Sequence, residues 1–98
     1  MASIVYSPNA LANLERAFAH FPGKEPETAV LAASAIRTAV ELLAHHPFIG
    51  RPVADDLREL VISYGRTGYV ALYRFVIEKD QIRVLAVRHQ RELGYQTG

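Results

Sequence analysis

The chain has 98 residues, of which 50% are hydrophobic and 21% are charged, and it contains no cysteine. This composition is typical of one globular domain spanning residues 1–98, and no apolar run approaches the roughly 20 residues of a membrane helix. The lack of cysteine excludes disulfides, thiolate nucleophiles and cysteine zinc sites. Residues 1–6 contain neither a basic segment nor a long apolar one. We therefore expect no secretory signal, no membrane association and a cytoplasmic protein.

The net charge is only +1, and the basic residues gather in the second half of the chain. Residues 1–50 carry three basic and four acidic residues, whereas residues 51–98 carry eight basic and six acidic ones. Seven of those eight are arginines, which suit bidentate contacts with carboxylates and phosphates. Proteins that bind mainly to phosphate backbones carry a much larger basic excess. The charge therefore favours selective contacts by individual arginines over a general grip on nucleic acid.

The first expected elements are a short strand and a helix. Apolar residues within Ser3–Ser7 predict the strand, and Ser7-Pro8 predicts the start of the helix. Serine is a preferred N-cap, and proline is tolerated at the first helical position. Apolar side chains then recur at helical spacing and form one face: Leu11, Leu14, Phe18 and Phe21. Pro22-Gly23 should end this helix.

A second helix should begin at Pro26, where Glu25 and Glu27 lie favourably against the positive end of the helix dipole. His45-His46-Pro47 should end it. Because only about five residues join the two helices, we expect an antiparallel hairpin. The second helix has an apolar stripe that is rich in alanine: Ala29, Ala32, Ala33, Ile36, Ala39, Val40 and Leu43.

Beyond an expected loop at Phe48–Asp56, the apolar pattern changes from helical to strand-like. Short turn-like stretches, Gly65–Gly68 and Glu78–Asp80, separate three apolar segments, and such connections predict an antiparallel meander. The sequence therefore predicts an α+β fold with the order β-α-α-β-β-β, in which the helical hairpin packs on one face of the sheet. The three meander strands should be Leu57–Tyr64, Gly68–Ile77 and Gln81–Arg88.

The second meander strand carries an arginine among apolar residues. Because side chains alternate along a strand, Arg74 should point away from the face that packs beneath the helices. We expect Arg74 either to form an ion pair with Glu59 or Glu92 or to face a partner that covers the sheet. The side chains expected beneath the helices are aromatic: Tyr69, Tyr73 and Phe75.

Arg58 and Glu59 open the first meander strand. They should point to opposite faces, so they cannot form one catalytic pair. For Arg58 we expect a solvated edge or a partner contact.

The side chains best suited to chemistry follow the last strand. His89 could act as a general base, because histidine has a pKa near 6.5, and Tyr95 could donate a proton. Together with phosphate-binding arginines they would support cleavage of RNA through its 2′-hydroxyl. The alternative is a C-terminal segment that merely packs on the sheet. The full candidate set is Arg88, His89, Arg91 and Tyr95.

No metal site and no cofactor are expected. His45 and His46 are adjacent, and adjacent residues point about 100° apart on a helix, whereas metal-ligand pairs usually lie four residues apart. A histidine at a helix C-terminus has a sufficient electrostatic reason to be there.

These segments, in this order and spacing, resemble the RelE/ParE superfamily of toxins from type II toxin–antitoxin (plasmid stabilisation) systems. The resemblance covers nearly the whole chain. It implies the fold described above and a growth-inhibiting toxin that forms a hetero-oligomer with a cognate antitoxin, whose C-terminal segment wraps the toxin as a helix or an added strand. The motifs that carry it are Ser7-Pro8 with the helical hairpin, His46-Pro47-Phe48-Ile49-Gly50-Arg51-Pro52, Leu57-Arg58-Glu59-Leu60, Gly68-Tyr69-Val70-Ala71-Leu72-Tyr73-Arg74 and Val84–Glu92.

The resemblance implies one of two targets. RelE-like members cleave mRNA in the ribosome, whereas ParE-like members share the fold and inhibit DNA gyrase by binding. Many RelE-like nucleases have an arginine directly after the Gly-Tyr that opens the second meander strand, but this chain has Val70 there. We therefore expect a ParE-like inhibitor that is not an enzyme, and its partner-binding residues should be Arg58, Arg74, Arg88 and Arg91.

Two other functions remain open from the sequence. One is a RelE-like, metal-independent endoribonuclease whose catalytic residues would be Arg88, His89, Arg91 and Tyr95. The other is a protein that has kept the toxin fold, lost toxicity and serves as a binding or regulatory partner.

Overall fold

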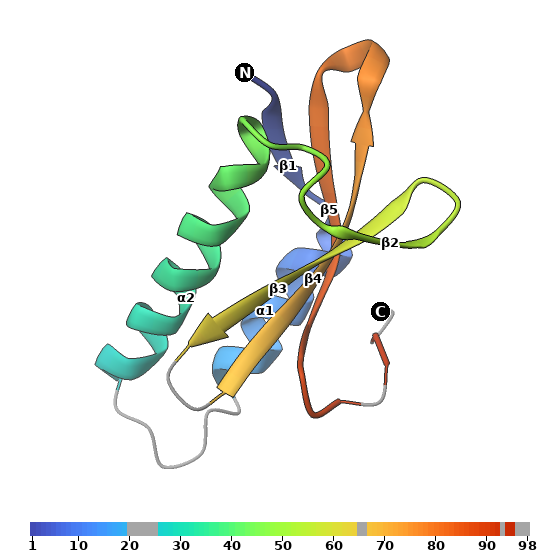
Figure 1. The fold of residues 1–98 in the computed structure, drawn as a ribbon. Helices are drawn as coiled ribbons and strands as arrows, with labels where there is room; N and C mark the ends of the chain where they lie inside the picture. Colours follow the sequence, from blue (N-terminus) through green and yellow to red (C-terminus); the bar gives the residue numbers. More distant parts are fainter. Residues whose placement is uncertain (20–25, 65–66, 93, 96–98) are drawn as a thin grey trace.

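A computed structural model describes residues 1–19, 26–64, 67–92 and 94–95 (Figure 1). The predicted order of helices and strands is confirmed, with one additional strand. The elements in chain order are β1 (Ser3–Tyr6), α1 (Pro8–Ala19), α2 (Pro26–Glu41), the 3-10 helix η1 (Leu42–Ala44), β2 (Arg51–Ala54), β3 (Leu57–Tyr64), β4 (Thr67–Val76), the 3-10 helix η2 (Ile77–Lys79) and β5 (Gln81–His89).

The five strands form one mixed sheet in the order β1-β5-β4-β3-β2. The predicted meander is confirmed, because β3, β4 and β5 pair antiparallel in succession. β1 adds to it as a parallel edge strand beside β5. Both helices pack on the same face of the sheet, with α1 mainly against β5 and α2 against β3 (Figure 1).

The core lies between the helices and β4 and β5. Tyr69 and Tyr73 of β4 are 1% and 0% exposed, and Phe75 packs against the same cluster. The expectation that these three aromatic residues pack beneath the helices is confirmed. The helices contribute the apolar stripe of α2 and η1, of which four side chains are fully buried: Ala32, Ile36, Val40 and Leu43.

The N-cap predicted at Ser7 is confirmed. The Ser7 hydroxyl oxygen accepts a hydrogen bond of 3.0 Å from the Ala10 amide, and Pro8 occupies the first helical position. The predicted end of α1 at Pro22-Gly23 lies outside the described residues, as do Phe21 and the turn residues Gly65 and Arg66.

The expected loop at Phe48–Asp56 is wrong for its middle part, where Arg51–Ala54 form β2. All four residues of β2 are exposed, so the segment shows no alternation of apolar and polar residues that would predict a strand. Pro52 also lacks an N–H donor, which confines it to an edge strand. β2 is held by backbone pairing with β3, and the hairpin turns at Asp55, whose φ of 47° lies in the left-handed region.

None of the helices within the described ranges is long and apolar enough to span a membrane.

Candidate functional site on the open face of the sheet

The side chains that point away from the helices line a second face of the sheet, which we call the open face. In β4, Tyr69 and Tyr73 point toward the helices, so the residues between them point to the open face. The strand register places Glu59 of β3 beside Leu72 and Arg88 of β5 beside Val70 on this face. The open face therefore contains both a carboxylate and arginines.

Glu59 lies at the centre of a polar cluster on the open face. It is only 8% exposed, although it is an acid in the middle of a sheet. Its Oε1 accepts hydrogen bonds from Nε and Nη2 of Arg51, at 3.0 and 2.7 Å. Its Oε2 accepts a hydrogen bond of 2.6 Å from the Tyr95 hydroxyl. The carboxylate is thus paired with a charged and a neutral donor, as a buried acid requires.

These contacts shift two pKa values in opposite directions. Burial opposes ionisation of Glu59, but the hydrogen bonds from Tyr95 and Arg51 outweigh it and hold the pKa of Glu59 below its ordinary value. Burial and the adjacent Glu59 carboxylate raise the pKa of Tyr95 well above its ordinary value of 10. Tyr95 therefore remains protonated at neutral pH and acts as a hydrogen-bond donor to Glu59.

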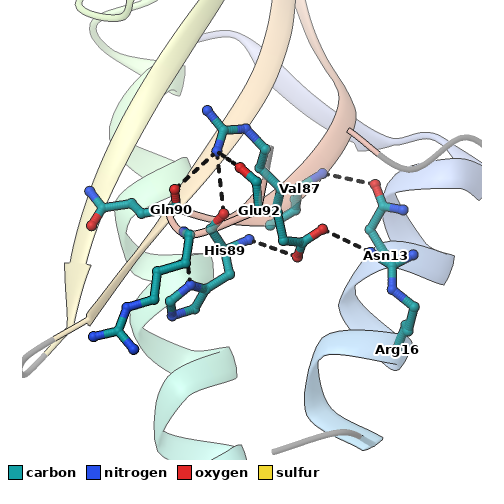
Figure 2. Close-up of polar contacts among 8 residues, drawn as sticks. Asn13, Arg16, Val87, His89, Gln90 and Glu92 are labelled. Carbon is teal, nitrogen blue, oxygen red and sulfur yellow. Dashed lines mark hydrogen bonds and ion pairs between the residues drawn. The ribbon is translucent and has the colours of Figure 1, made fainter. Parts of the chain in front are cut away.

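Arg88 completes this cluster by folding over the C-terminal segment. Its Nη1 donates hydrogen bonds to the carbonyl oxygens of His89, Gln90 and Glu92, at 3.3, 3.4 and 3.0 Å (Figure 2). Its guanidinium carbon lies 5.1 Å from the centroid of the Tyr95 ring, within cation–π distance. Arg88 therefore ties the turn after β5 to the segment that carries Tyr95.

His89 points to the other face of the sheet, toward the helices. Its register partner is Tyr69, and the two rings meet edge to face with their centroids 5.4 Å apart. Its Nδ1 accepts a hydrogen bond of 3.1 Å from the Arg91 amide, and its own amide donates to Glu92 Oε1 at 3.1 Å (Figure 2). The Arg91 residue itself is exposed on the turn.

The structure thus divides the four residues that the sequence offered as a catalytic set. Arg88 and Tyr95 are in contact on the open face, whereas the His89 ring lies beside Tyr69 on the helix side. The hydrogen bond between Arg91 and His89 uses the backbone amide of Arg91 and not its guanidinium. A catalytic role for the four residues remains a prediction.

Arg58 points to the opposite face from Glu59, as the sequence predicts, and it holds the loop before β2. Its Nη1 donates to the carbonyl oxygens of Phe48 and Gly50, at 3.0 and 2.8 Å. Its guanidinium carbon also lies 5.1 Å from the centroid of the Phe48 ring. These contacts give Arg58 a structural role, and its role in partner binding remains a prediction.

Tyr73 fixes the same loop from the core. Its hydroxyl donates to the Pro47 carbonyl oxygen and accepts from the Gly50 amide, each at 2.9 Å. A Cβ atom on Gly50 would lie 2.6 Å from the Tyr73 ring and 2.8 Å from the Glu59 carbonyl oxygen. A side chain would not fit there without a shift of the Glu59 backbone, which explains the glycine at position 50.

Arg74 lies on the open face, as expected, but neither of its expected ion-pair partners is correct. Glu59 is paired with Arg51, and Glu92 lies 3.6 Å from Arg16 of α1 (Figure 2). The nearest acid to Arg74 is Asp56, with 3.8 Å between Nη1 and Oδ2. Both side chains are substantially exposed, at 42% and 62%.

The sequence did not single out Arg51 or Asn13, although both shape this region. Arg51 lay in an expected loop, and its position opposite Glu59 depends on β2. Asn13 is 2% exposed on α1, and its Oδ1 accepts the Val87 amide of β5 at 3.0 Å (Figure 2). Its only sequence signal is a polar residue beside the apolar face of a helix. Within the described ranges no group of three or more His, Asp or Glu residues is placed to hold a metal ion.

Comparisons with known proteins agree with this fold. The sequence profile of the ParE toxin of type II toxin–antitoxin (parDE) systems matches residues 4–94. Toxin RelE3 of Caulobacter vibrioides is 32% identical over 92 residues, which cover 94% of this chain and 98% of that toxin. 

Two solved structures share the fold at lower identity. The chromosomal ParDE toxin–antitoxin system of P. aeruginosa matches with a TM-score of 0.72 and 24% identity, over 91% of this chain and 96% of that one. The intact E. coli RelBE toxin–antitoxin complex matches with a TM-score of 0.63 and 13% identity, over 94% and 100% of the two chains. The match to nearly the whole family profile and the identity with RelE3 confirm the predicted resemblance, and the chain belongs to the RelE/ParE superfamily of type II toxin–antitoxin toxins.

Proposed function

We propose that this toxin is ParE-like, that it arrests growth by binding DNA gyrase without cleaving a substrate, and that a cognate antitoxin neutralises it. The observation that carries the proposal is the division of the candidate catalytic set between two faces of the sheet. Arg88 and Tyr95 lie on the open face, whereas His89 lies beside Tyr69 on the helix side.

This division argues against acid–base cleavage, because a general base and a general acid must both reach one phosphodiester. The Tyr95 hydroxyl already donates a hydrogen bond to Glu59, and that carboxylate would repel a phosphate. Val70 stands opposite Arg88 in the register and is 3% exposed, where many RelE-like nucleases have an arginine. The open face therefore lacks a second cation beside Arg88 at this position.

The alternative function is RelE-like cleavage of mRNA on the ribosome. It is favoured by the name of the relative that is 32% identical, toxin RelE3. It is also favoured by the contact between Arg88 and Tyr95, two residue types that the nuclease members use near the C-terminus.

An antitoxin partner is supported by the solved relatives, which are titled as toxin–antitoxin systems and complexes. A groove with a volume of about 400 Å³ also lies between β1 and the two helices. Its lining is mainly apolar and includes Ile4, Leu11, Leu14 and Ile36. This shape and composition suit the apolar face of an antitoxin helix.

The groove can be tested with two exposed leucines. Leu11 lines it and is 52% exposed, whereas Leu31 of α2 is 60% exposed and does not line it. Leu11→Glu should weaken binding of the co-expressed antitoxin at least about tenfold, since a charge would have to be buried at the contact. Leu31→Glu is the matched control. Equal antitoxin affinity of the two variants, measured by calorimetry, would exclude this groove.

The target is decided by two assays, one with the purified toxin and one in arrested cells. If the proposal holds, the toxin inhibits supercoiling by gyrase in vitro, and added antitoxin restores it. His89→Ala should inhibit gyrase as the parent does, because the proposal gives His89 no catalytic role. Intact supercoiling at saturating toxin would remove the proposal.

The second assay is primer extension on translated mRNA in arrested cells. A nuclease would produce cuts that disappear in His89→Ala, whereas we expect uncut message during arrest. Expression without antitoxin tests the remaining function, a binding or regulatory protein that has kept the toxin fold. Such a protein would leave growth unchanged, whereas a gyrase inhibitor or a nuclease would arrest it.

A further inference from the structure

One row of side chains crosses the open face next to the row that contains Glu59 and Leu72. The register places Val5 of β1 beside Arg83 of β5, Arg83 beside Arg74 of β4, and Arg74 beside Leu57 of β3. These four residues alternate with core positions on their strands and therefore share the open face. Two arginines thus lie directly opposite each other, flanked on both sides by aliphatic side chains.

Such an arrangement is unfavourable in the free protein. Like charges directly opposite on neighbouring strands destabilise a sheet. The acid paired with this row is Asp56, which is exposed and forms an ion pair of 3.8 Å with Arg74 Nη1, beyond hydrogen-bond distance. Glu59 lies in the adjacent row of the same face, but its carboxylate is held by Arg51. Arg83 Nε is used in a hydrogen bond of 2.8 Å to Gln81 Oε1, which orients the guanidinium and supplies no negative charge.

Arg74 also has a donor without an acceptor. Its Nε is buried and, alone among the buried side-chain polar atoms of the described residues, has no hydrogen-bond partner. A buried N–H left unpaired is unfavourable, so the Arg74 guanidinium is not fully satisfied in the free protein. An anion bound at the exposed part of that guanidinium would relieve the repulsion from Arg83.

The surroundings favour a carboxylate of a protein over a nucleic-acid backbone. A phosphate backbone needs a continuous basic track, but Arg51 and Arg88 are already committed to Glu59 and to the C-terminal carbonyl oxygens. The net charge of the chain is only +1. Val5 is 44% exposed beside the arginines, and Leu57 is half-buried on their other side. Aliphatic neighbours of this kind suit the apolar side chains of a peptide that also carries an acidic residue.

We propose that Arg74 and Arg83 form a carboxylate-binding site on the open face, which takes an Asp or Glu side chain from an extended segment of a protein partner. The inference deepens the proposed function by giving the chemistry of a partner, and it rests on that partner being a protein. It does not depend on whether the partner is gyrase or an antitoxin.

The test uses the full chain and two synthetic peptides, one alternating glutamate with valine and one in which glutamine replaces glutamate. The Nε–Hε resonances of arginines are followed by ¹⁵N NMR during the titration. The glutamate peptide should shift the Arg74 Nε–Hε resonance, because a carboxylate bound to the same guanidinium changes its electronic environment. The glutamine peptide should leave it in place. If the glutamate peptide in large excess does not move the Arg74 resonance, the site does not exist.

Variants separate this site from general attraction between charges. Arg83→Gln and Arg74→Lys should each weaken the glutamate peptide about tenfold, since each removes part of a charged, bidentate contact. Lys79→Gln, which removes the same charge from an exposed position on η2, is the matched control. If Lys79→Gln weakens the peptide as much as Arg83→Gln, the inference is overturned.

Two further results bear on the same site. Arg83→Gln should raise the Tm of the free protein, because it removes the repulsion from Arg74. If Arg83 instead stabilised the fold, the same substitution would lower the Tm. Asp56→Asn should tighten the peptide, because it removes a competing carboxylate. Inorganic phosphate and a short RNA are titrated in the same way. If either binds more tightly than the glutamate peptide, the two arginines form a phosphate site and the inference is wrong. None of these measurements uses gyrase or antitoxin, so a failure of the supercoiling assay leaves them standing.

Discussion

At the scale of single residues, Glu59 determines how the C-terminal segment lies. A carboxylate that is 8% exposed needs all its partners, and its partners come from β2 and from the end of the chain. Arg51 and Tyr95 are thereby held over the open face by one acid. The same contact consumes the two groups that would otherwise be free to bind a phosphate.

Glu59→Gln should destabilise the protein by about 1.5–3 kcal/mol, because it replaces charge-assisted hydrogen bonds and leaves Arg51 without its counter-ion. Urea denaturation measures this directly. Tyr95→Phe is the matched variant, since it removes one hydrogen bond but keeps the ring against Arg88. It should cost less than Glu59→Gln. Equal stability of Glu59→Gln and the parent would show that the cluster contributes nothing.

Gly50 illustrates a constraint that comes from close approach. Gly50→Ala should cost about 1–3 kcal/mol, because its Cβ would meet the Tyr73 ring and the rigid Glu59 carbonyl oxygen at under 3.0 Å. Gly94→Ala is the control, since nothing lies within 4 Å of a Cβ at that position. Thermal unfolding of the two variants compares them, and similar Tm values would contradict the argument.

At the scale of elements, α1 takes the place of a strand beside β5. β1 ends at Tyr6, and beyond it polar side chains of the α1 segment bind the exposed edge of β5. The Leu85 carbonyl oxygen accepts from the Ser7 hydroxyl and from Asn9 Nδ2, at 3.0 and 3.1 Å. The Val87 amide donates to Asn13 Oδ1. Backbone groups of β5 that have lost a strand neighbour are thus paired by a helix.

Asn13→Ala should therefore cost about 1–3 kcal/mol, since it leaves the buried Val87 amide unpaired. Hydrogen exchange should show a loss of protection at the Val87 amide. Asn9→Ala should cost less, because the Leu85 carbonyl oxygen keeps its bond from Ser7. An unchanged exchange rate at Val87 in Asn13→Ala would show that the side chain is dispensable.

The sequence predicts the elements well wherever a local signal exists. Ser7-Pro8 marks the start of α1, and the alternation of Tyr69, Tyr73 and Phe75 identifies the buried side of β4. β2 carries no such signal, because it is exposed and is held only by backbone pairing. 

The candidate site is harder to predict, because it depends on the path of the chain after β5. Period two places Arg88 and His89 on opposite faces, but the contact between Tyr95 and Glu59 joins residues 36 positions apart. No local pattern reports such a contact. The partner of Arg74 was missed for the same reason, since Asp56 lies on the turn that β2 creates.

At the scale of the whole molecule, stability should depend on pH through the Glu59 cluster. The pKa of Glu59 is lowered on folding, so its contribution is complete above the ordinary value of 4.5 and is lost as the pH falls through the lower, folded-state pKa. The pKa of Tyr95 is raised, so its contribution is complete below 10 and is lost as the pH rises through the folded-state pKa.

Denaturation of the parent and of Glu59→Gln at several pH values checks the acid side. The difference in unfolding free energy between them should be constant near neutral pH. It should shrink below about pH 4.5, where Glu59 of the unfolded parent takes up a proton while Glu59 of the folded parent is still ionised. A difference that does not change with pH would mean that Glu59 acts only through its shape.

The place of β5 in the sheet also has a consequence for how the toxin is made. β5 is synthesised after all the other strands, yet it lies between β1 and β4. Until it emerges from the ribosome, β1 has no neighbour among the described strands, and α1 lacks the surface on which it mainly packs. A nascent chain that ends at Lys79 should therefore be digested completely by a protease, whereas a protected fragment would contradict this. The fold should therefore be completed only after the last strand has left the ribosome.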